Sequence, residues 1–176
     1  MERRAVFLDR DGILNRVELR DGKPYPPREL TREIITPGIG PALACLKQKD
    51  FLLIVATNQP DVVTGKQSRA ALEAFHALLK TLLPLDEIRV CMELDSPECR
   101  CYKPKPGMLL DAAKAHGIDL SASYMIGDRW RDVGAGKAAG CFSIFVDYGY
   151  HEKRPDQPDA VVADPLAAID FVLSRN

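Results

Sequence analysis

The sequence has almost no net charge and no long apolar run, and each absence excludes a class of protein. Its 176 residues include 24 Lys and Arg and 25 Asp and Glu, so the formal net charge is only −1. Without a surplus of basic residues, the chain has no global field that would attract nucleic acid or an anionic membrane. The longest apolar run, Phe51–Ala56, is far shorter than the ~20 residues of a transmembrane helix. We therefore expect neither a nucleic-acid partner nor a membrane partner.

The sequence also lacks a secretory signal and a disulfide framework. Arg3 and Arg4 lead directly into a strand-like segment, without the apolar region and small-residue cleavage site of a signal peptide. The five cysteines are an odd number and are widely spread, which argues against a framework of disulfides. Because 46% of the residues are hydrophobic, the chain can build a core of its own. We expect a cytoplasmic monomer with Cys45 and Cys141 in its core.

Short apolar runs alternate with helix-like segments along the whole chain. The runs show no strict alternation of polar and apolar residues, which is typical of strands covered on both faces. The predicted strands are Ala5–Leu8, Phe51–Ala56, Ile88–Met92, Tyr124–Ile126, Ser143–Val146 and Ala160–Val162. This alternation predicts an α/β fold with a doubly wound, mostly parallel, Rossmann-like sheet in a single domain, residues 1–176.

Helix signals separate the predicted strands. Apolar residues recur at helical spacing between residues 72 and 82. Gly117 and Gly140 lie where helix C-terminal caps would fall, and Asp164-Pro165 predicts the start of a last helix that runs through Leu173. The remaining long stretches are predicted loops, at residues 16–37, 59–66 and 93–106.

Polar side chains suited to chemistry follow four of the predicted strands in turn. They are Asp9 and Asp11, then Thr57 and Asn58, then Lys103, and finally Asp128. Taken singly, each has a plainer explanation as a polar strand end, a helix cap or a solvated lysine. In an open α/β sheet, however, ligands bind beyond the carboxyl ends of the strands. We expect these side chains to meet at one edge of the sheet.

This set of residues, in this order, resembles the four-part signature of the haloacid dehalogenase-like hydrolases, and the resemblance covers nearly the whole chain. It implies a magnesium-dependent phosphatase that acts on a small phosphorylated sugar. Asp9 would be the nucleophile that forms an aspartyl-phosphate, and Asp11 the general acid and base. A halide leaves without a proton, so an acid at position 11 favours phosphoester chemistry over dehalogenation.

The same resemblance implies the binding roles at the site. The residues concerned are Thr57, Asn58 and Lys103 for the phosphoryl group, and Asp9, Asp128 and the backbone carbonyl of Asp11 for Mg2+. Cationic and hydroxyl groups are needed there because the phosphoryl oxygens carry charge throughout the transition state. Oxygen ligands are those that Mg2+ prefers.

The spacing of the motifs points to the branch of the superfamily that lacks a cap domain. The intervals from Asp11 to Thr57 and from Thr57 to Lys103 are both 46 residues, too short for an additional folded domain. The three predicted loops would then shape the entrance to the site. The motifs DRDGILN, TNQ, KPKPGM and GDRWRD resemble this branch, in which heptose bisphosphate phosphatases are the nearer match and histidinol-phosphate phosphatases the alternative.

Two positions depart from the pattern of that branch. Pro60-Asp61 follow the TNQ motif where Ser-Gly is common, and Tyr102 replaces an arginine that helps to recognise a second phosphate. An uncharged phenol cannot replace a guanidinium group. Candidates for the missing charge are Arg20, Lys105, Arg129 and Arg131.

A cysteine-rich segment resembles a loop that binds structural zinc in relatives. It contains Cys91, Cys99 and Cys101, with Glu93 at the position of a histidine ligand. Cysteine thiolates with this spacing suit tetrahedral zinc, and a carboxylate can complete the set. The resemblance thus implies a zinc site with three cysteines and one glutamate; a reduced, metal-free loop is the alternative.

Two other classes of function are compatible with parts of the pattern. A receiver-like signalling module also uses an acidic pair, a threonine and a lysine, but its phosphorylated aspartate lies in a middle strand of a shorter chain. A phosphatase for nucleic-acid ends would need a basic stripe with interleaved aromatic residues, and only 7% of the residues are aromatic.

Overall fold

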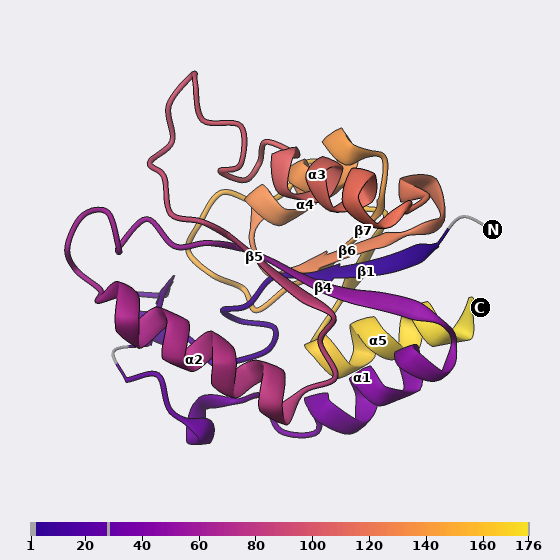
Figure 1. The fold of residues 1–176 in the computed structure, drawn as a ribbon, viewed down its shortest axis with the longest axis horizontal. Helices are drawn as coiled ribbons and strands as arrows, with labels where there is room; N and C mark the ends of the chain where they lie inside the picture. The colour runs from indigo at the N-terminus through magenta and orange to yellow at the C-terminus, as the bar shows by residue number, and fades with distance from the viewer. Residues whose placement is uncertain (1–2, 28, 176) are drawn as a thin grey trace.

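The protein is described here by a computed structural model that covers residues 3–27 and 29–175. Parallel strands form a six-stranded sheet in the order β5-β4-β1-β6-β7-β8 (Figure 1). The strands are β1 (Arg4–Leu8), β4 (Phe51–Asn58), β5 (Glu87–Cys91), β6 (Tyr124–Gly127), β7 (Phe142–Val146) and β8 (Ala160–Val162). All the strands predicted from the sequence are confirmed, as is the doubly wound α/β fold.

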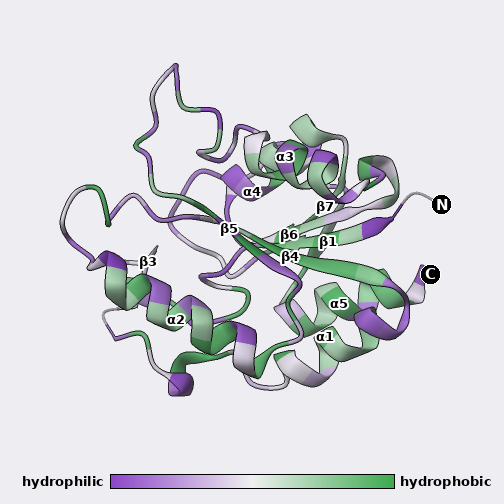
Figure 2. Ribbon diagram, in the orientation of Figure 1, coloured by the Kyte–Doolittle hydropathy of each residue, from purple (hydrophilic) through white to green (hydrophobic). Residues whose placement is uncertain are grey.

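Helices cover both faces of this sheet. The helices are α1 (Ile39–Gln48), α2 (Arg69–Leu82), α3 (Gly107–His116), α4 (Trp130–Ala139) and α5 (Pro165–Ser174). Helices α1 and α5 lie on one side of the sheet and α3 and α4 on the other (Figure 1). In the central strand β1, Val6 and Leu8 pack in a core cluster with α1, α2 and α5, whereas Ala5 and Phe7 pack toward α3. The strands are therefore apolar on both faces, as their hydropathy shows (Figure 2).

The parallel register brings the ends of β1, β4 and β6 to the same edge. Leu8 at the end of β1 is aligned with Val55 of β4 and with Ile126 of β6. The backbone N–H of Asp9 extends this alignment, because it donates to the carbonyl of Ile126 at 2.9 Å. The residues that follow each strand therefore emerge side by side.

The predicted helix ends are confirmed at both kinds of terminus. Gly117 and Gly140 adopt left-handed φ values of 64° and 88° at the C-terminal caps of α3 and α4. The Asp164 carboxylate accepts a hydrogen bond from the N–H of Ala167 at 2.9 Å and so caps α5. Cys45, which we expected in the core, is exposed on α1, because the core face of that helix is formed by Ile39, Leu43 and Leu46.

The predicted loop 16–37 is more ordered than expected. It contains an antiparallel hairpin of β2 (Glu18–Arg20) and β3 (Lys23–Tyr25), followed by a short 3-10 helix at Arg32–Ile34. The hairpin turns at Asp21-Gly22, whose φ values of 51° and 74° are both positive. Two positive φ values match the right-handed twist of the strands, and Asp-Gly is a preferred pair for such a turn.

No cap domain is present among residues 3–27 and 29–175. Between β1 and β4 the chain forms the hairpin, the 3-10 helix and α1, and between β4 and β5 it forms α2. Residues 59–66 and 93–106 contain neither helix nor strand, as predicted. In the described part of the chain, no helix has both the length and the apolar character needed to cross a membrane.

Candidate active site

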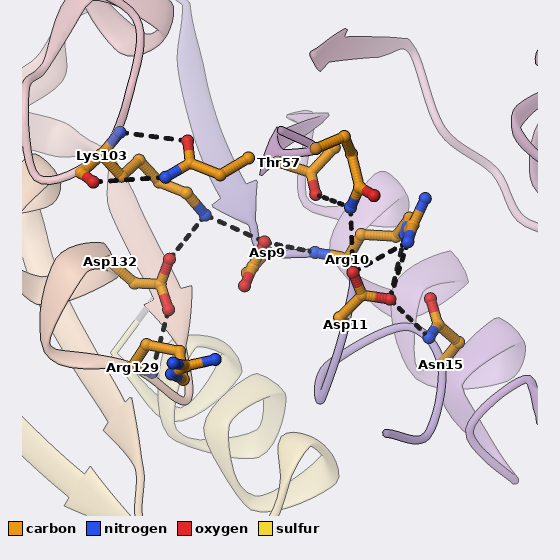
Figure 3. Close-up of polar contacts among 10 residues, drawn as sticks. Asp9, Arg10, Asp11, Asn15, Thr57, Lys103, Arg129 and Asp132 are labelled. Carbon is orange, nitrogen blue, oxygen red and sulfur yellow. Dashed lines mark hydrogen bonds and ion pairs between the residues drawn. The ribbon is translucent and has the colours of Figure 1, made fainter. Parts of the chain in front are cut away.

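The predicted nucleophile lies in a buried chain of charges at the sheet edge (Figure 3). Asp9 is 8% exposed and Lys103 only 2%. The Nζ of Lys103 lies 2.9 Å from Asp9 Oδ1 and 2.5 Å from Asp132 Oδ1. Asp9 Oδ1 also accepts a hydrogen bond from the backbone N–H of Arg10 at 2.8 Å. Lys103 therefore holds together two carboxylates, one from the end of β1 and one from the residues that follow β6.

The surroundings raise the pKa values of both Asp9 and Lys103. Burial, reinforced by the carboxylate of Asp132, raises the pKa of Asp9 to about 7, although Lys103 opposes the shift. Burial alone would lower the pKa of Lys103, but the carboxylates of Asp132 and Asp9 outweigh it and raise that pKa above its ordinary value. Lys103 therefore stays protonated as the cation of the site.

Asp128 is placed against the turn that follows the acidic pair. A Cβ atom at Gly12, whose φ is +86°, would lie 2.0 Å from Asp128 Oδ2, so only glycine permits this approach. Both carboxylate oxygens of Asp128 are buried without a hydrogen bond of normal geometry among the described residues, although the Tyr150 hydroxyl is close enough to oppose the rise in the pKa of Asp128. Burial and the neighbouring carboxylate of Asp9 raise the pKa of Asp128. A buried carboxyl group in this state either takes up a proton or is ionised beside a cation.

The acidic side chains at the sheet edge fit a magnesium ion. Single oxygens from Asp9, Asp128 and Asp132 lie within 4.8 Å of one another, and carboxylate oxygens are hard ligands of the type that Mg2+ takes. Asp132 already uses Oδ1 for Lys103 and Oδ2 for the backbone N–H of Arg129 at 2.9 Å. Asp9 and Asp128 are therefore the carboxylates available to an ion, and their role as magnesium ligands stays a prediction.

Asp132 was not predicted from the sequence, although its motif contains a signal. It is the last residue of GDRWRD, four positions after Asp128, and it is 1% exposed on the first turn of α4. An acidic residue buried at a helix start, next to a motif already identified, is a candidate partner for the buried lysine. The structure shows that this residue fixes the side chain of Lys103.

Asp11 occupies a different environment from Asp9. Its carboxylate accepts hydrogen bonds from Arg10 Nη2 at 2.8 Å, Asn15 Nδ2 at 2.9 Å and Gln59 Nε2 at 2.9 Å. Burial would raise the pKa of Asp11, but the charge of Arg10 and these hydrogen bonds lower it below its ordinary value. In this arrangement, Asp11 is ionised and firmly held.

The two residues that follow β4 have separate roles. Thr57 Oγ1 is buried and accepts a hydrogen bond from Gln59 Nε2 at 2.9 Å, so its own hydroxyl proton is available to a ligand. Asn58, predicted to bind the substrate, lines the cavity above the site, and its amide also contacts the backbone of Lys103, whose N–H donates to Oδ1 at 3.0 Å. Asn58 Nδ2 in turn donates to the Lys103 carbonyl at 3.2 Å. The Asn58 amide thus holds the segment that carries the lysine, next to the cis peptide Lys103-Pro104.

A cavity of about 1070 Å³ opens above these groups. Its lining includes Asp9, Asp11, Thr57, Lys103 and Asp128, together with residues from all three predicted loops, among them Val17, Lys66 and Tyr102. The volume is large enough for a phosphorylated sugar.

Three of the four cations considered for a second phosphate line this cavity. Arg20 and Arg129 do so, but each is paired, with Glu18 and Glu152 respectively. Arg131 lies 3.7 Å from Glu152, with its guanidinium 5.9 Å from the ring centre of Tyr102 and 4.7 Å from that of Trp130. Lys105 points elsewhere and bonds to Asp95 at 3.2 Å.

The cysteine-rich segment forms a compact sulfur cluster, with one difference from expectation. Cys91 and Cys101 are joined by a disulfide, which the sequence did not predict. The thiol of Cys99 lies 3.8 Å from Cys91 Sγ and 3.7 Å from Cys101 Sγ, and Glu93 Oε1 lies 3.7 Å from Cys101 Sγ. The predicted ligands are therefore together, and with the disulfide reduced their donor set fits a zinc ion.

Comparison with known proteins agrees with this geometry. Residues 100–169 match the family model described as HAD-hydrolase-like. The D-glycero-D-manno-heptose-1,7-bisphosphate 7-phosphatase of Thermosynechococcus vestitus is 31% identical over 99% of this chain and 98% of its own length. The D-glycero-beta-D-manno-heptose-1,7-bisphosphate 7-phosphatase of Pseudomonas aeruginosa is 33% identical over 98% of this chain and 99% of its own length. The chain belongs to the haloacid dehalogenase-like phosphatases.

A solved structure supports the membership of this phosphatase superfamily. The crystal structure of D,D-heptose 1,7-bisphosphate phosphatase from B. bronchiseptica, complexed with magnesium and phosphate, has a TM-score of 0.81 and 30% sequence identity. The match covers 98% of this chain and 99% of that one. The fold of this haloacid dehalogenase-like phosphatase is thus shared, over its full length, with a protein seen with magnesium and phosphate.

Proposed function

We propose that the protein removes the 7-phosphate of D-glycero-D-manno-heptose 1,7-bisphosphate, through an aspartyl-phosphate on Asp9 and with Mg2+ as cofactor. The names of the relatives support the substrate. The observation that carries the chemistry is the buried pair of Asp9 and Lys103, 2.9 Å apart at the floor of the cavity. A carboxylate beside a fixed cation is a nucleophile held where a phosphoryl group can be bound.

In the first half of the reaction, a carboxylate oxygen of Asp9 attacks phosphorus, and the bond from phosphorus to the sugar oxygen breaks. The negative charge of the bound phosphate raises the pKa of Asp11, which takes up a proton from solvent and gives it to that oxygen, so the sugar leaves as an alcohol. Lys103 and Thr57 bind the oxygens of the phosphoryl group during transfer. When bound by Asp9, Asp128 and the backbone carbonyl of Asp11, Mg2+ neutralises charge between nucleophile and phosphate.

In the second half, ionised Asp11 takes a proton from a water molecule, whose oxygen attacks the phosphorus of the aspartyl-phosphate. The bond to Asp9 breaks, which regenerates the carboxylate and releases inorganic phosphate. This step uses Asp11 in its ionised state, which its hydrogen bonds stabilise. Asp11 thus returns to its protonated state, ready for the next substrate.

The remote phosphate of a bisphosphate also needs a cation, and we assign this role to Arg131. Its side chain lines the cavity and stacks between Tyr102 and Trp130, while its nearest acidic partner is 3.7 Å away. Stacking on aromatic rings holds a guanidinium group in place without neutralising it. The charge that Tyr102 lacks would thus come from the neighbouring helix.

A phosphate-release assay tests the proposal. Purified protein with Mg2+ is compared on heptose 1,7-bisphosphate, heptose 7-phosphate and histidinol phosphate, beside Asp9→Asn as a variant of nearly equal shape. We expect the fastest release from the bisphosphate and a loss of at least about 10³-fold in the variant. Faster hydrolysis of histidinol phosphate would overturn the sugar substrate, and full activity of Asp9→Asn would overturn the mechanism.

We further propose that the cysteine cluster binds zinc once reduced, through Cys91, Cys99, Cys101 and Glu93. The sulfur and carboxylate positions support this, since the ligands are already adjacent. Thiolate ligands need a reducing compartment, which supports a cytoplasmic location. Metal analysis after purification in reductant should give one zinc per chain; a protein that carries none would refute the site. Size-exclusion chromatography with light scattering tests the expected monomer.

A further inference from the structure

Arg10 lies between the two aspartates of the first motif, but its side chain is fully buried and is not part of the reaction described above. Its Nε and Nη2 donate to Asp11 Oδ1 at 3.1 and 2.9 Å, and Nη2 also contacts Asp11 Oδ2 at 2.8 Å. The remaining nitrogen, Nη1, lies 3.1 Å from Nε2 of His76 on α2. The guanidinium is also stacked against Phe75, 5.6 Å from the ring centre. Arg10 therefore connects Asp11 to helix α2.

The contact with Arg10 fixes the chemical state of His76. A guanidinium group can only donate hydrogen bonds, so Nε2 of His76 must be the acceptor and carry no proton. Burial, followed by the charge of Arg10, lowers the pKa of His76 to about 4. His76 is therefore a neutral imidazole at physiological pH, with its lone pair directed at Arg10.

The remaining partners of Asp11 explain why this connection matters. Asn15 and Gln59 each donate one hydrogen bond to the carboxylate, and both come from segments outside helices and strands. Arg10, by contrast, donates several hydrogen bonds to the Asp11 carboxylate. A guanidinium that binds both oxygens fixes the plane of a carboxylate as well as its position. A displacement of about 1 Å in a catalytic group can cost about 10²-fold in rate, so the anchor of Arg10 bears on catalysis.

We propose that His76 and Arg10 are positioning residues for proton transfer: His76 holds the guanidinium of Arg10, which orients the carboxylate of Asp11 toward the leaving oxygen. This inference rests on the proposed role of Asp11 as general acid. It assigns a function to a histidine of α2 that lies outside the sequence motifs of the site. Neither residue is among those that line the cavity, so we expect their effect to pass through Asp11.

Leaving-group dependence separates positioning from a general structural role. A sugar alkoxide needs a proton from Asp11, whereas p-nitrophenolate leaves as a stable anion. We expect His76→Leu to slow the first turnover of the sugar phosphate about tenfold, with little change in KM. This is a partial loss of the roughly 10²–10⁴-fold that general acid catalysis contributes. The first-turnover burst of p-nitrophenol should change by less than about twofold, because that step needs no acid.

Two further variants control the experiment. His76→Gln retains a side-chain carbonyl that can accept from Arg10 and should restore most of the rate. His116→Leu removes another part-buried histidine, which contacts Glu87 at 2.8 Å on the opposite side of the sheet, and should leave both substrates unaffected. Equal losses on both substrates, or no loss on either, in folded His76→Leu would overturn the inference.

Asp11→Asn distinguishes failure of this inference from failure of the proposed mechanism. If Asp11→Asn shows the selective loss on the sugar phosphate and His76→Leu does not, only the role of His76 is refuted. If Asp11→Asn shows no selectivity, the acid role of Asp11 falls, and the inference falls with it. A nitrogen-15 spectrum of the wild-type protein gives a readout independent of activity: a proton on Nε2 of His76 would also overturn the contact.

Discussion

Asp9 and Asp11 are two positions apart in the sequence, but their carboxyl groups lie in opposite electrostatic surroundings. The carboxylates of Asp9, Asp128 and Asp132 are buried within 4.8 Å of one another, and the ammonium group of Lys103 pairs with two of them, Asp9 and Asp132. Around Asp11, N–H donors surround a single carboxylate. One region has an excess of negative charge, and the other has an excess of donors.

This difference gives two chemically identical side chains different pKa values and different roles. Burial and like charges raise the pKa of Asp9 to about 7, whereas Arg10 and hydrogen bonds overcome burial and lower that of Asp11. These are the pKa values of the unliganded site; the proposed roles need Asp9 ionised and Asp11 protonated, and a cation beside Asp9 and a phosphate group beside Asp11 shift both pKa values in that direction. The region around Asp9 is incomplete without a cation, whereas the region around Asp11 is complete in itself.

The largest effect should come from removing the cation on which the Asp9 region depends. Lys103→Met leaves Asp9 and Asp132 buried without their shared partner. We expect unfolding in urea at pH 7 to show a loss of about 3–5 kcal/mol, as when one member of a buried ion pair is removed. Phosphatase activity should fall below detection. Lys105→Met is the matched control, since that lysine is part-exposed and should change stability by less than about 0.5 kcal/mol. Equal stability of the two variants would contradict the comparison.

The next effect concerns Asp128, which should lower the stability of the protein without magnesium and raise it when magnesium is bound. Without metal, Asp128→Asn removes a carboxyl group whose ionisation is opposed by burial and by Asp9, so we expect a Tm above that of the wild type. With Mg2+ at about 100 times its Kd, the wild type should gain about 2.7 kcal/mol and the variant almost nothing. Differential scanning fluorimetry gives the Tm of both proteins, with EDTA and with Mg2+. Asp147→Asn, an aspartate paired with Arg154 beyond β7, should respond to Mg2+ like the wild type.

A smaller effect appears in the pH dependence of metal-free protein. For an acid whose pKa is raised on folding, the folded state binds more protons between the two pKa values, so stability falls as pH rises. With a shift of Asp9 from 3.8 to about 7, this fall should occur between about pH 4 and 7. Asp9→Asn lacks this titration, so its stability relative to the wild type should increase over that range. Urea unfolding of both proteins in EDTA checks the difference; parallel curves would refute it.

The sequence predicted the strands and the residues at their ends because both follow from local signals. Buried parallel strands are apolar runs, and a polar residue directly after such a run is visible without a structure. The hairpin at Asp21-Gly22 also had a visible signal in its Asp-Gly pair. The sequence could not show contacts between residues that are far apart in the chain. Examples are the bond of the Asn58 side chain to the Lys103 backbone and the contact of His76 with Arg10.

The cysteine cluster is a second case in which the sequence predicts which residues meet but not how they interact. The spacing of Cys91, Cys99 and Cys101 predicted that the sulfurs would meet, and they do. Spacing alone does not determine whether the thiols bind a metal or each other, because both arrangements need the sulfurs within a few ångströms. Redox state and metal supply decide between them, and neither is encoded in the residues.

The smallest effect should come from Gln59, which joins the Asp11 region to the phosphate-binding hydroxyl. Its Nε2 donates both to Asp11 Oδ2 and to Thr57 Oγ1 at 2.9 Å, while Arg10 and Asn15 hold the carboxylate from the other side. Gln59→Met has a similar volume and removes only these bonds. Because Asp11 retains its stronger charged partner, we expect a loss of about 1 kcal/mol in stability and a decrease in kcat of less than about tenfold. Steady-state kinetics beside urea unfolding measures both. A loss of activity as large as that of Lys103→Met would mean that the Asp11 region, too, depends on a single donor, and that the contrast between the two aspartates is wrong.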